Sequence, residues 1–134
     1  MRYLLDTHVL FWAMSEEERL PRQVLSILND PENEIYFSSA SVWEVVIKHN
    51  KNPRNMPISG QEFADGCLLS GYIPLSIDNQ HILAVGTLNR GEGEPPHNDP
   101  FDRILIAQAK TENMILITHD GLLSGYHEEC IMKI

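Results

Sequence analysis

The 134-residue sequence has few of the features that mark disulfide-rich, secreted or membrane proteins. It has only two cysteines, Cys67 and Cys130, whereas a disulfide scaffold needs a denser pattern in a short secreted chain. We interpret both as reduced thiols of a cytoplasmic protein. No apolar run reaches the length of about 18 residues that a transmembrane helix needs. Because Asp6 and His8 interrupt the apolar residues 1–14, we expect neither a membrane span nor a signal peptide.

Basic residues are also scarce. Ten Lys and Arg stand against 19 Asp and Glu, for a net charge of −9. This balance argues against broad electrostatic binding to nucleic acid. A basic partner would help such a chain to meet RNA, or would shield it from RNA.

Two motifs of other enzymes are missing. The segment GEGEPP is too acidic and proline-rich for a phosphate-binding loop, and no G-x-S-x-G nucleophile motif occurs.

The length suits a single domain over residues 1–134, and 43% apolar residues suffice for a hydrophobic core. Apolar, β-prone runs predict strands at 2–5, 35–37, 72–75 and 114–117, with a last edge strand at 130–134. Helical spacing predicts helices at 8–12, 21–28, 38–49, 60–70, 79–88 and 101–112, and residues 89–100 are the most loop-like stretch. This alternation favours an α/β fold with a parallel sheet and helices on both faces.

Two carboxylates directly follow predicted strands. Asp6 follows strand 2–5, and Asp120 follows strand 114–117 after Thr118 and His119. Sites in such folds lie beyond the carboxyl ends of the strands. Hard cations such as Mg²⁺ and Mn²⁺ prefer oxygen ligands, and two-metal phosphodiester hydrolysis needs carboxylates that hold the metals about 3.5–4 Å apart. The simpler explanations are an N-cap for Asp6 and a turn residue for Asp120.

A third acid, Glu44, lies in the apolar segment SSASVWEVVIK. Ser41 and Glu44 have the S-x-x-E spacing of a capping box, which would explain the acid structurally. If Ser38 or Ser39 begins the helix instead, Glu44 lies in its middle, where an acid among apolar residues calls for a functional reason.

The segment PPHNDPFDR holds the remaining candidates. Asp99 before Pro100 predicts an N-cap with proline at the first helical position. The negative charge of Asp102 would then stabilise the N-terminus of that helix. A helix N-terminus is also a suitable place to hold phosphate or a metal-bound anion. His97 is either a solvated loop residue, a contact to substrate phosphate or a residue that supports a ligand. Arg103 either pairs with a nearby acid or contacts RNA phosphate.

Four motifs together resemble the PIN-domain family, and especially the VapC-type toxins of type II toxin–antitoxin systems. They are LLDTHVLFWA at 4–13, SSASVWEVVIK at 38–48, HNDPFDRILIAQAK at 97–110 and ILITHD at 115–120. Each motif alone has a capping explanation. The four in the family's order span nearly the whole chain, and that order makes the resemblance specific.

The resemblance implies a three-layer α/β/α sandwich with a central, mostly parallel sheet. It implies that Asp6, Glu44, Asp102 and Asp120 converge in one acidic pocket that binds Mg²⁺ or Mn²⁺ and cleaves RNA endonucleolytically. Thr118 matches a small hydroxyl residue that would orient ligands, and Asp99 matches a supporting acid of a subgroup.

Further implications concern position 8 and the partners. His8 stands where the family often has asparagine. The resemblance also implies a homodimer and a cognate antitoxin that directs a basic side chain toward the acidic pocket, which the charge of −9 fits.

Two other interpretations compete with a ribonuclease. One is a non-catalytic PIN-fold module that binds proteins, against which all four acids are present. The other is a metal-dependent phosphatase or receiver-like domain. A receiver needs paired acids after its first strand and a lysine after its last, but Asp6 stands alone and no lysine follows Ile117. The helical acids Glu44 and Asp102 favour the nuclease.

Overall fold

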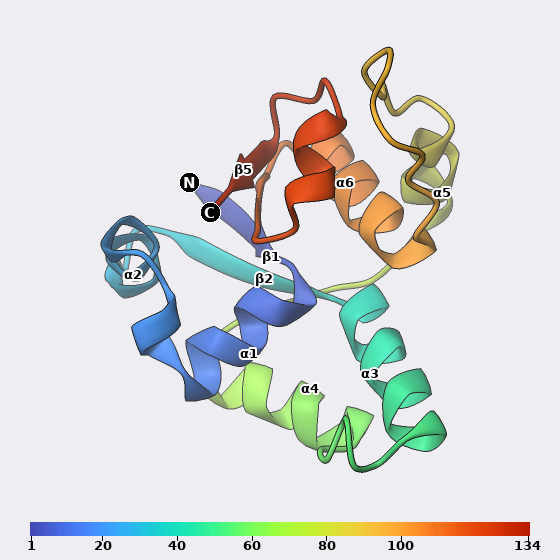
Figure 1. The fold of residues 1–134 in the computed structure, drawn as a ribbon. Coiled ribbons are helices and arrows are strands. Elements are labelled where there is room, and N and C mark those ends of the chain that lie inside the picture. Colours follow the sequence, from blue (N-terminus) through green and yellow to red (C-terminus); the bar gives the residue numbers. More distant parts are fainter.

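Five strands and six α-helices alternate in the computed structural model, which describes residues 1–134 (Figure 1). The strands are β1 (Arg2–Leu5), β2 (Glu34–Ser38), β3 (Ile73–Leu75), β4 (Ile115–Thr118) and β5 (Ile131–Lys133). The helices are α1 (Thr7–Ser15), α2 (Arg22–Asn29), α3 (Ser39–Lys51), α4 (Gly60–Leu69), α5 (Asn79–Val85) and α6 (Pro100–Glu112). Two short 3₁₀ helices, η1 (Glu17–Arg19) and η2 (Gly121–Gly125), were not expected from the sequence.

The strands form one sheet in the order β3-β2-β1-β4-β5, and every neighbouring pair is parallel. In the central strand β1, Tyr3 pairs with Ile35 of β2 on one side and with Ile115 of β4 on the other. From β1 the chain builds outward to β2 and β3, then crosses back to add β4 and β5. The strand order therefore reverses between β1 and β4, and ligands of open parallel sheets bind at the carboxyl ends of strands at such a point.

Two apolar clusters, one on each face of the sheet, confirm the three-layer α/β/α sandwich. Strand residues alternate between the faces, so Leu5 and Ile117 join one cluster while Leu4 and Leu116 join the other. Helices α1, α2 and α4 pack on the first face, and α6 packs on the second with α5 against it (Figure 1). Helix α3 contributes to both clusters and therefore lies at the edge of both layers.

The predicted elements all exist, with small differences at their ends. Helix α2 begins after Pro21, whose extended backbone places it at the N-cap. Strand β4 runs one residue further than predicted, because Thr118 pairs with Lys133 of β5. Helix α5 ends at Val85 rather than residue 88, since Gly86 caps it. None of the helices is both long and apolar enough for a membrane crossing.

Candidate metal centre

Asp6 lies at the carboxyl end of the central strand and is only 6% exposed. Its Oδ1 accepts the Val9 N–H at 3.0 Å, so it does cap α1, as the simpler explanation predicted. Its other oxygen, Oδ2, accepts a short hydrogen bond from the Thr118 hydroxyl. Burial raises the pKa of Asp6, while the bonds from Thr118 and Val9 lower it. Capping therefore does not account for the whole side chain, because Oδ2 faces the end of β4.

Thr118 and Asp120 lie at the carboxyl end of β4, next to Asp6 at the end of β1. The buried Thr118 hydroxyl, which donates to Asp6, accepts the Asp120 N–H at 3.1 Å. Asp120 is half-buried and caps η2, where its Oδ1 accepts the Leu122 N–H at 2.9 Å. One hydroxyl thus ties the two strand ends together and sets the spacing between their acids.

Glu44 lies within α3 and does not take part in a capping box with Ser41. The N-cap is Ser38, whose hydroxyl oxygen accepts the Ala40 N–H at 3.0 Å. Glu44 is consequently the sixth residue of the helix, and its Oε1 accepts the Thr7 hydroxyl at 2.7 Å. Its Oε2 pairs with Lys48 at 2.7 Å, one turn further along. The contact from Thr7, the residue after Asp6, brings Glu44 to the carboxyl end of β1.

The N-terminus of α6 supplies two more acids. Asp99 is exposed and caps the helix, with Oδ1 accepting the N–H groups of Phe101 at 2.9 Å and Asp102 at 3.2 Å. The predicted N-cap with Pro100 at the first helical position is confirmed. Asp102 then projects from the first turn, and its Oδ2 lies 3.2 Å from Nε2 of His97.

Electrostatics shows that these carboxyl groups share one region. The pKa of Asp102 is raised to about 8. Burial is the largest cause, and the negative charges of four acids add to it: Asp99, Asp120, Asp6 and Glu44. The helix N-terminus would by itself favour the charged form. The pKa of Asp102 is nevertheless raised, so the negative charge around it outweighs the effect of the helix N-terminus. Such an excess of negative charge is expected where a cation binds.

His97 is not the solvated loop residue of the simplest prediction. It is 8% exposed, and its Nδ1 lies 2.7 Å from the hydroxyl of Tyr126. Burial lowers the pKa of His97, as does the positive charge of Arg90. The guanidinium of Arg90 stacks on the Tyr126 ring at 4.7 Å. Sequence reasoning missed Tyr126 and Arg90, because nothing in the chain between residues 90 and 126 signals that these positions meet.

Arg103 does not form the expected ion pair with a nearby acid. Its Nη2 donates to the carbonyl of Val85 at 3.3 Å, and its buried Nε has no partner. His119 points out of the strand end, packs edge-on against Trp12 at 4.8 Å and contacts the carbonyl of Ile134 at 3.0 Å. These residues border the acids without bonding to them.

The donor set suits a hard divalent cation. Carboxylate oxygens predominate, and ligand atoms of His97, Asp102 and Asp120 lie within 4.8 Å of one another. Asp6 and Glu44 lie outside this group of three, although their charges help to raise the pKa of Asp102, and Glu44 is paired with Lys48. A second group, Asp78, His81 and Glu112, lies toward the other end of α6. His81 is explained there without a metal, since Nδ1 accepts the Asp78 N–H in a capping box and Nε2 contacts Glu112.

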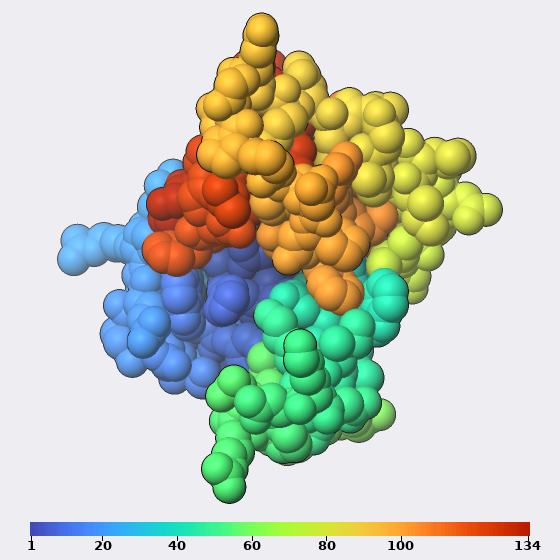
Figure 2. All heavy atoms as spheres, turned by 45° about the vertical axis from the view of Figure 1, so that its right-hand side comes forward, coloured from blue at the N-terminus to red at the C-terminus, as the bar shows by residue number.

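A hollow lies on the surface where the N-terminal segment meets α3 and α6 (Figure 2). In Figure 2 the N-terminal segment, in blue, forms the bottom of a recess whose rim is coloured teal, orange and red. These colours correspond to α3, the start of α6 and the η2 region. The recess lies among the elements that carry Glu44, Asp102 and Asp120.

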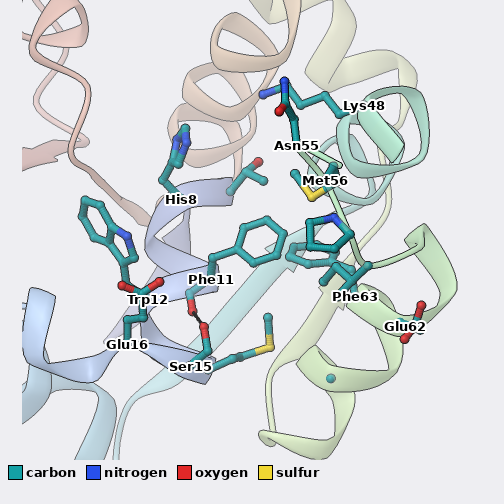
Figure 3. Close-up of a pocket in the computed structure, with 15 residues that line it drawn as sticks. His8, Phe11, Trp12, Ser15, Glu16, Lys48, Asn55, Met56, Glu62 and Phe63 are labelled. Atoms are coloured by element: carbon teal, nitrogen blue, oxygen red, sulfur yellow. Dashed lines mark hydrogen bonds between the residues drawn. The ribbon is translucent and has the colours of Figure 1, made fainter. Parts of the chain in front are cut away.

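A groove of about 540 Å³ continues from this site between α1 and the segment from α3 to α4. Phe11, Met56 and Phe63 give it an apolar floor, and Glu16 and Glu62 add negative charge (Figure 3). Its lining also includes Thr7 and Lys48, the two residues that hold the Glu44 carboxylate. The groove therefore adjoins Glu44 through the side chains of Thr7 and Lys48.

Comparisons with known proteins agree with the fold. A model of the PIN domain matches residues 3–126. VapBC2 from Rickettsia felis, bound to a DNA fragment from its promoter, superimposes with a TM-score of 0.70 at 17% identity, over 100% of this chain and 99% of that chain. DNA-bound VapBC from Salmonella typhimurium gives 0.69 at 15% identity, over 99% and 98% of the two chains. A toxin–antitoxin complex from Klebsiella pneumoniae gives 0.58 at 20% identity, over 98% and 99%. No curated protein matches the chain significantly.

Proposed function

The chain belongs to the PIN-domain family, and from this membership and its acidic site we propose that it is a metal-dependent endoribonuclease. We propose further that it is the toxin of a type II toxin–antitoxin pair of the VapC type, acting in the cytoplasm. The observation that supports the nuclease most directly is the grouping of ligand atoms of His97, Asp102 and Asp120 within 4.8 Å of one another, where burial and neighbouring negative charges raise the pKa of Asp102 to about 8. A divalent cation would neutralise these negative charges.

In this proposal Asp6, Glu44, Asp102 and Asp120 hold Mg²⁺ or Mn²⁺. Bound cations would lower the pKa of water to supply the nucleophile and would stabilise charge on the phosphodiester. The chain's own residues set the conditions for this chemistry. Asp102 holds a proton near neutral pH as long as no cation is bound, so cation binding releases a proton from the site.

Supporting residues orient these ligands. Thr118 holds Asp6 by its hydroxyl and Asp120 by its backbone. Asp99 caps α6 and so fixes the backbone from which Asp102 projects. Arg103, half-buried and next to Asp102 at the start of α6, is our candidate for a contact to RNA phosphate. No side-chain nucleophile is needed.

The groove beside the site suits a protein inhibitor. Its apolar floor and acidic rim match an amphipathic segment with basic residues, and the net charge of −9 favours association with a basic partner. The K. pneumoniae structure to which the chain is similar is a toxin–antitoxin complex. We propose that a cognate antitoxin occupies this groove and reaches the carboxylates past Thr7 and Lys48.

A different face would serve a homodimer. Trp43, Ile82 and Leu83 are 58%, 55% and 75% exposed, and a largely apolar hollow lies between α3, α5 and the start of α6. Trp43 packs edge-on against Phe101 at 5.2 Å at the border of this hollow. Exposed apolar surface of this kind marks a protein contact. We propose that two copies of the chain meet there.

The decisive experiment is cleavage of a mixed RNA pool by purified, antitoxin-free protein in Mg²⁺, Mn²⁺ or EDTA. Asp6→Asn and Asp102→Asn should abolish cleavage without loss of circular dichroism. Asp65→Asn is the matched control, because Asp65 is exposed on α4 and contacts only Gln61. If no metal supports cleavage and calorimetry detects no metal binding, the alternative of a non-catalytic PIN-fold binding module replaces this proposal.

A further inference from the structure

The proposed ligands do not explain why the His97 ring is enclosed. We infer that His97 is a positioning residue, whose Nε2–H holds the Asp102 carboxylate while Tyr126 decides which ring nitrogen carries the proton. The inference rests on the proposed function only in taking Asp102 as a metal ligand.

The contacts of His97 leave it no access to substrate. Its side chain is 4% exposed, and the Asp102 side chain beside it is 22% exposed. Nε2 faces Oδ2 of Asp102 at 3.2 Å, and the Tyr126 ring stands edge-on to the imidazole at 5.4 Å. Because both ring nitrogens already have partners, His97 is poorly placed to contact a phosphate.

The hydroxyl of Tyr126 selects the tautomer. It lies 2.7 Å from Nδ1 of His97 and 3.4 Å from the carbonyl oxygen of the same residue. The hydroxyl can donate its single proton to either acceptor, and we assign it to Nδ1 because that contact is the shorter of the two. Nδ1 of the neutral ring is then an acceptor, and the ring proton lies on Nε2, where it faces the carboxylate.

Arg90 holds this arrangement in place. Its Nε and Nη2 donate to the carbonyl of Pro95 at 3.0 and 2.7 Å, and its Nη1 donates to that of Leu122 at 2.6 Å. The same guanidinium stacks on Tyr126. One side chain thus connects the loop that carries His97 to η2, which has Asp120 as its N-cap and Tyr126 as its C-cap.

Gly125 permits this close approach. A Cβ atom at Gly125 would lie 2.6 Å from Nη1 of Arg90 and 2.9 Å from Oε2 of Glu94. The Gly91 N–H donates to the Gly125 carbonyl at 2.8 Å, which brings the two backbones together. The contact between the loop around Gly91 and the end of η2 therefore depends on glycine at position 125 as well as on Arg90.

Partners behind a metal ligand fix its orientation, and their loss typically weakens metal binding by about 10–100-fold. We expect His97→Ala to weaken Mn²⁺ binding, measured by calorimetry or EPR, by roughly that factor. His97→Gln should recover most of the affinity, because the glutamine amide can place an N–H where Nε2 was. Tyr126→Phe should give an intermediate loss. His127→Gln, at an exposed position, is the control. In RNA cleavage kcat should fall while KM for RNA stays unchanged.

Three results would overturn the inference. Mn²⁺ affinity of His97→Ala equal to wild type would remove the positioning role. A ligand atom of His97 lies within 4.8 Å of Asp102 and Asp120 oxygens, so His97 could itself bind the metal. A pulsed-EPR signal from a nitrogen bound to Mn²⁺ that is lost in His97→Gln would show that it does. A raised KM with unchanged metal affinity would make it a substrate contact.

Wild-type protein that binds no Mn²⁺ would instead refute the proposed function. The inference is then decided by imidazole ¹⁵N spectra of the metal-free protein, with His97→Gln used for assignment. At pH 9, where Asp102 is ionised in the metal-free protein, we expect the proton on Nε2 in wild type and a mixture of tautomers in Tyr126→Phe. A proton on Nδ1 in wild type would overturn the inference.

Discussion

Replacing Asp102 by asparagine should stabilise the metal-free protein at high pH. A carboxyl group whose pKa is raised by folding binds a proton in the folded state at pH values where the unfolded chain has released it. The free energy of unfolding therefore falls as the pH rises from the ordinary pKa of 3.8 to the folded value of about 8. The cost of the charge is complete only above this window. Asparagine has the same shape and no charge to bury.

The size of the effect follows from the two pKa values. They differ by about 4, and each pKa unit corresponds to about 1.4 kcal/mol, so the upper limit is about 6 kcal/mol. The Asp102 side chain is 22% exposed, so solvent and local relaxation will screen part of this. We expect a gain of about 2–3 kcal/mol for Asp102→Asn at pH 9, and little at pH 5. His97 keeps a partner, because the asparagine oxygen can accept its N–H.

Urea unfolding in EDTA at pH 5, 6, 7, 8 and 9 measures this directly. The stability difference between Asp102→Asn and wild type should grow up to about pH 8 and then level off. Mg²⁺ should restore stability to wild type at pH 9 and have much less effect on the variant. The exposed Asp65→Asn should track wild type. A difference that does not change with pH, or a variant less stable throughout, would refute the placement of Asp102 among the other acids.

Three further outcomes follow from single contacts. Thr118→Val removes the hydroxyl that holds Asp6, so Mg²⁺ affinity measured by calorimetry should fall about 10-fold or more while the fold persists. Ser38→Ala removes the cap of α3 and leaves the buried Gln108, which accepts the Ser38 hydroxyl at 2.5 Å, without that partner, so urea unfolding should show a loss of about 2–3 kcal/mol. Burial raises the pKa of the Cys67 thiol to about 12, so it should resist a thiol reagent at pH 8 until the protein unfolds, and rapid labelling of the folded protein would contradict its burial.

Much of the architecture followed from local pattern. The order of strands and helices could be predicted because apolar spacing differs between a helix and a strand, and that difference is visible within about ten residues. Asp99 with Pro100 predicted the start of α6 correctly, since N-capping depends only on neighbouring atoms. The acids at strand ends were found in the same way, because a parallel sheet places the carboxyl ends of its strands at one edge.

What the sequence left open was decided by contacts between distant segments. Whether Ser38 or Ser41 capped α3 depended on Thr7, which contacts both Ser41 and Glu44. His97 could be solvated or enclosed until Tyr126 was placed against it. Local pattern reports only on interactions within a turn or two, whereas burial, pKa shifts and the approach of Asp102 to Asp120 and His97 arise when the chain folds back on itself. The sequence alone thus determined the elements and the candidate carboxylates, and the tertiary structure decided how these carboxylates are buried, charged and held.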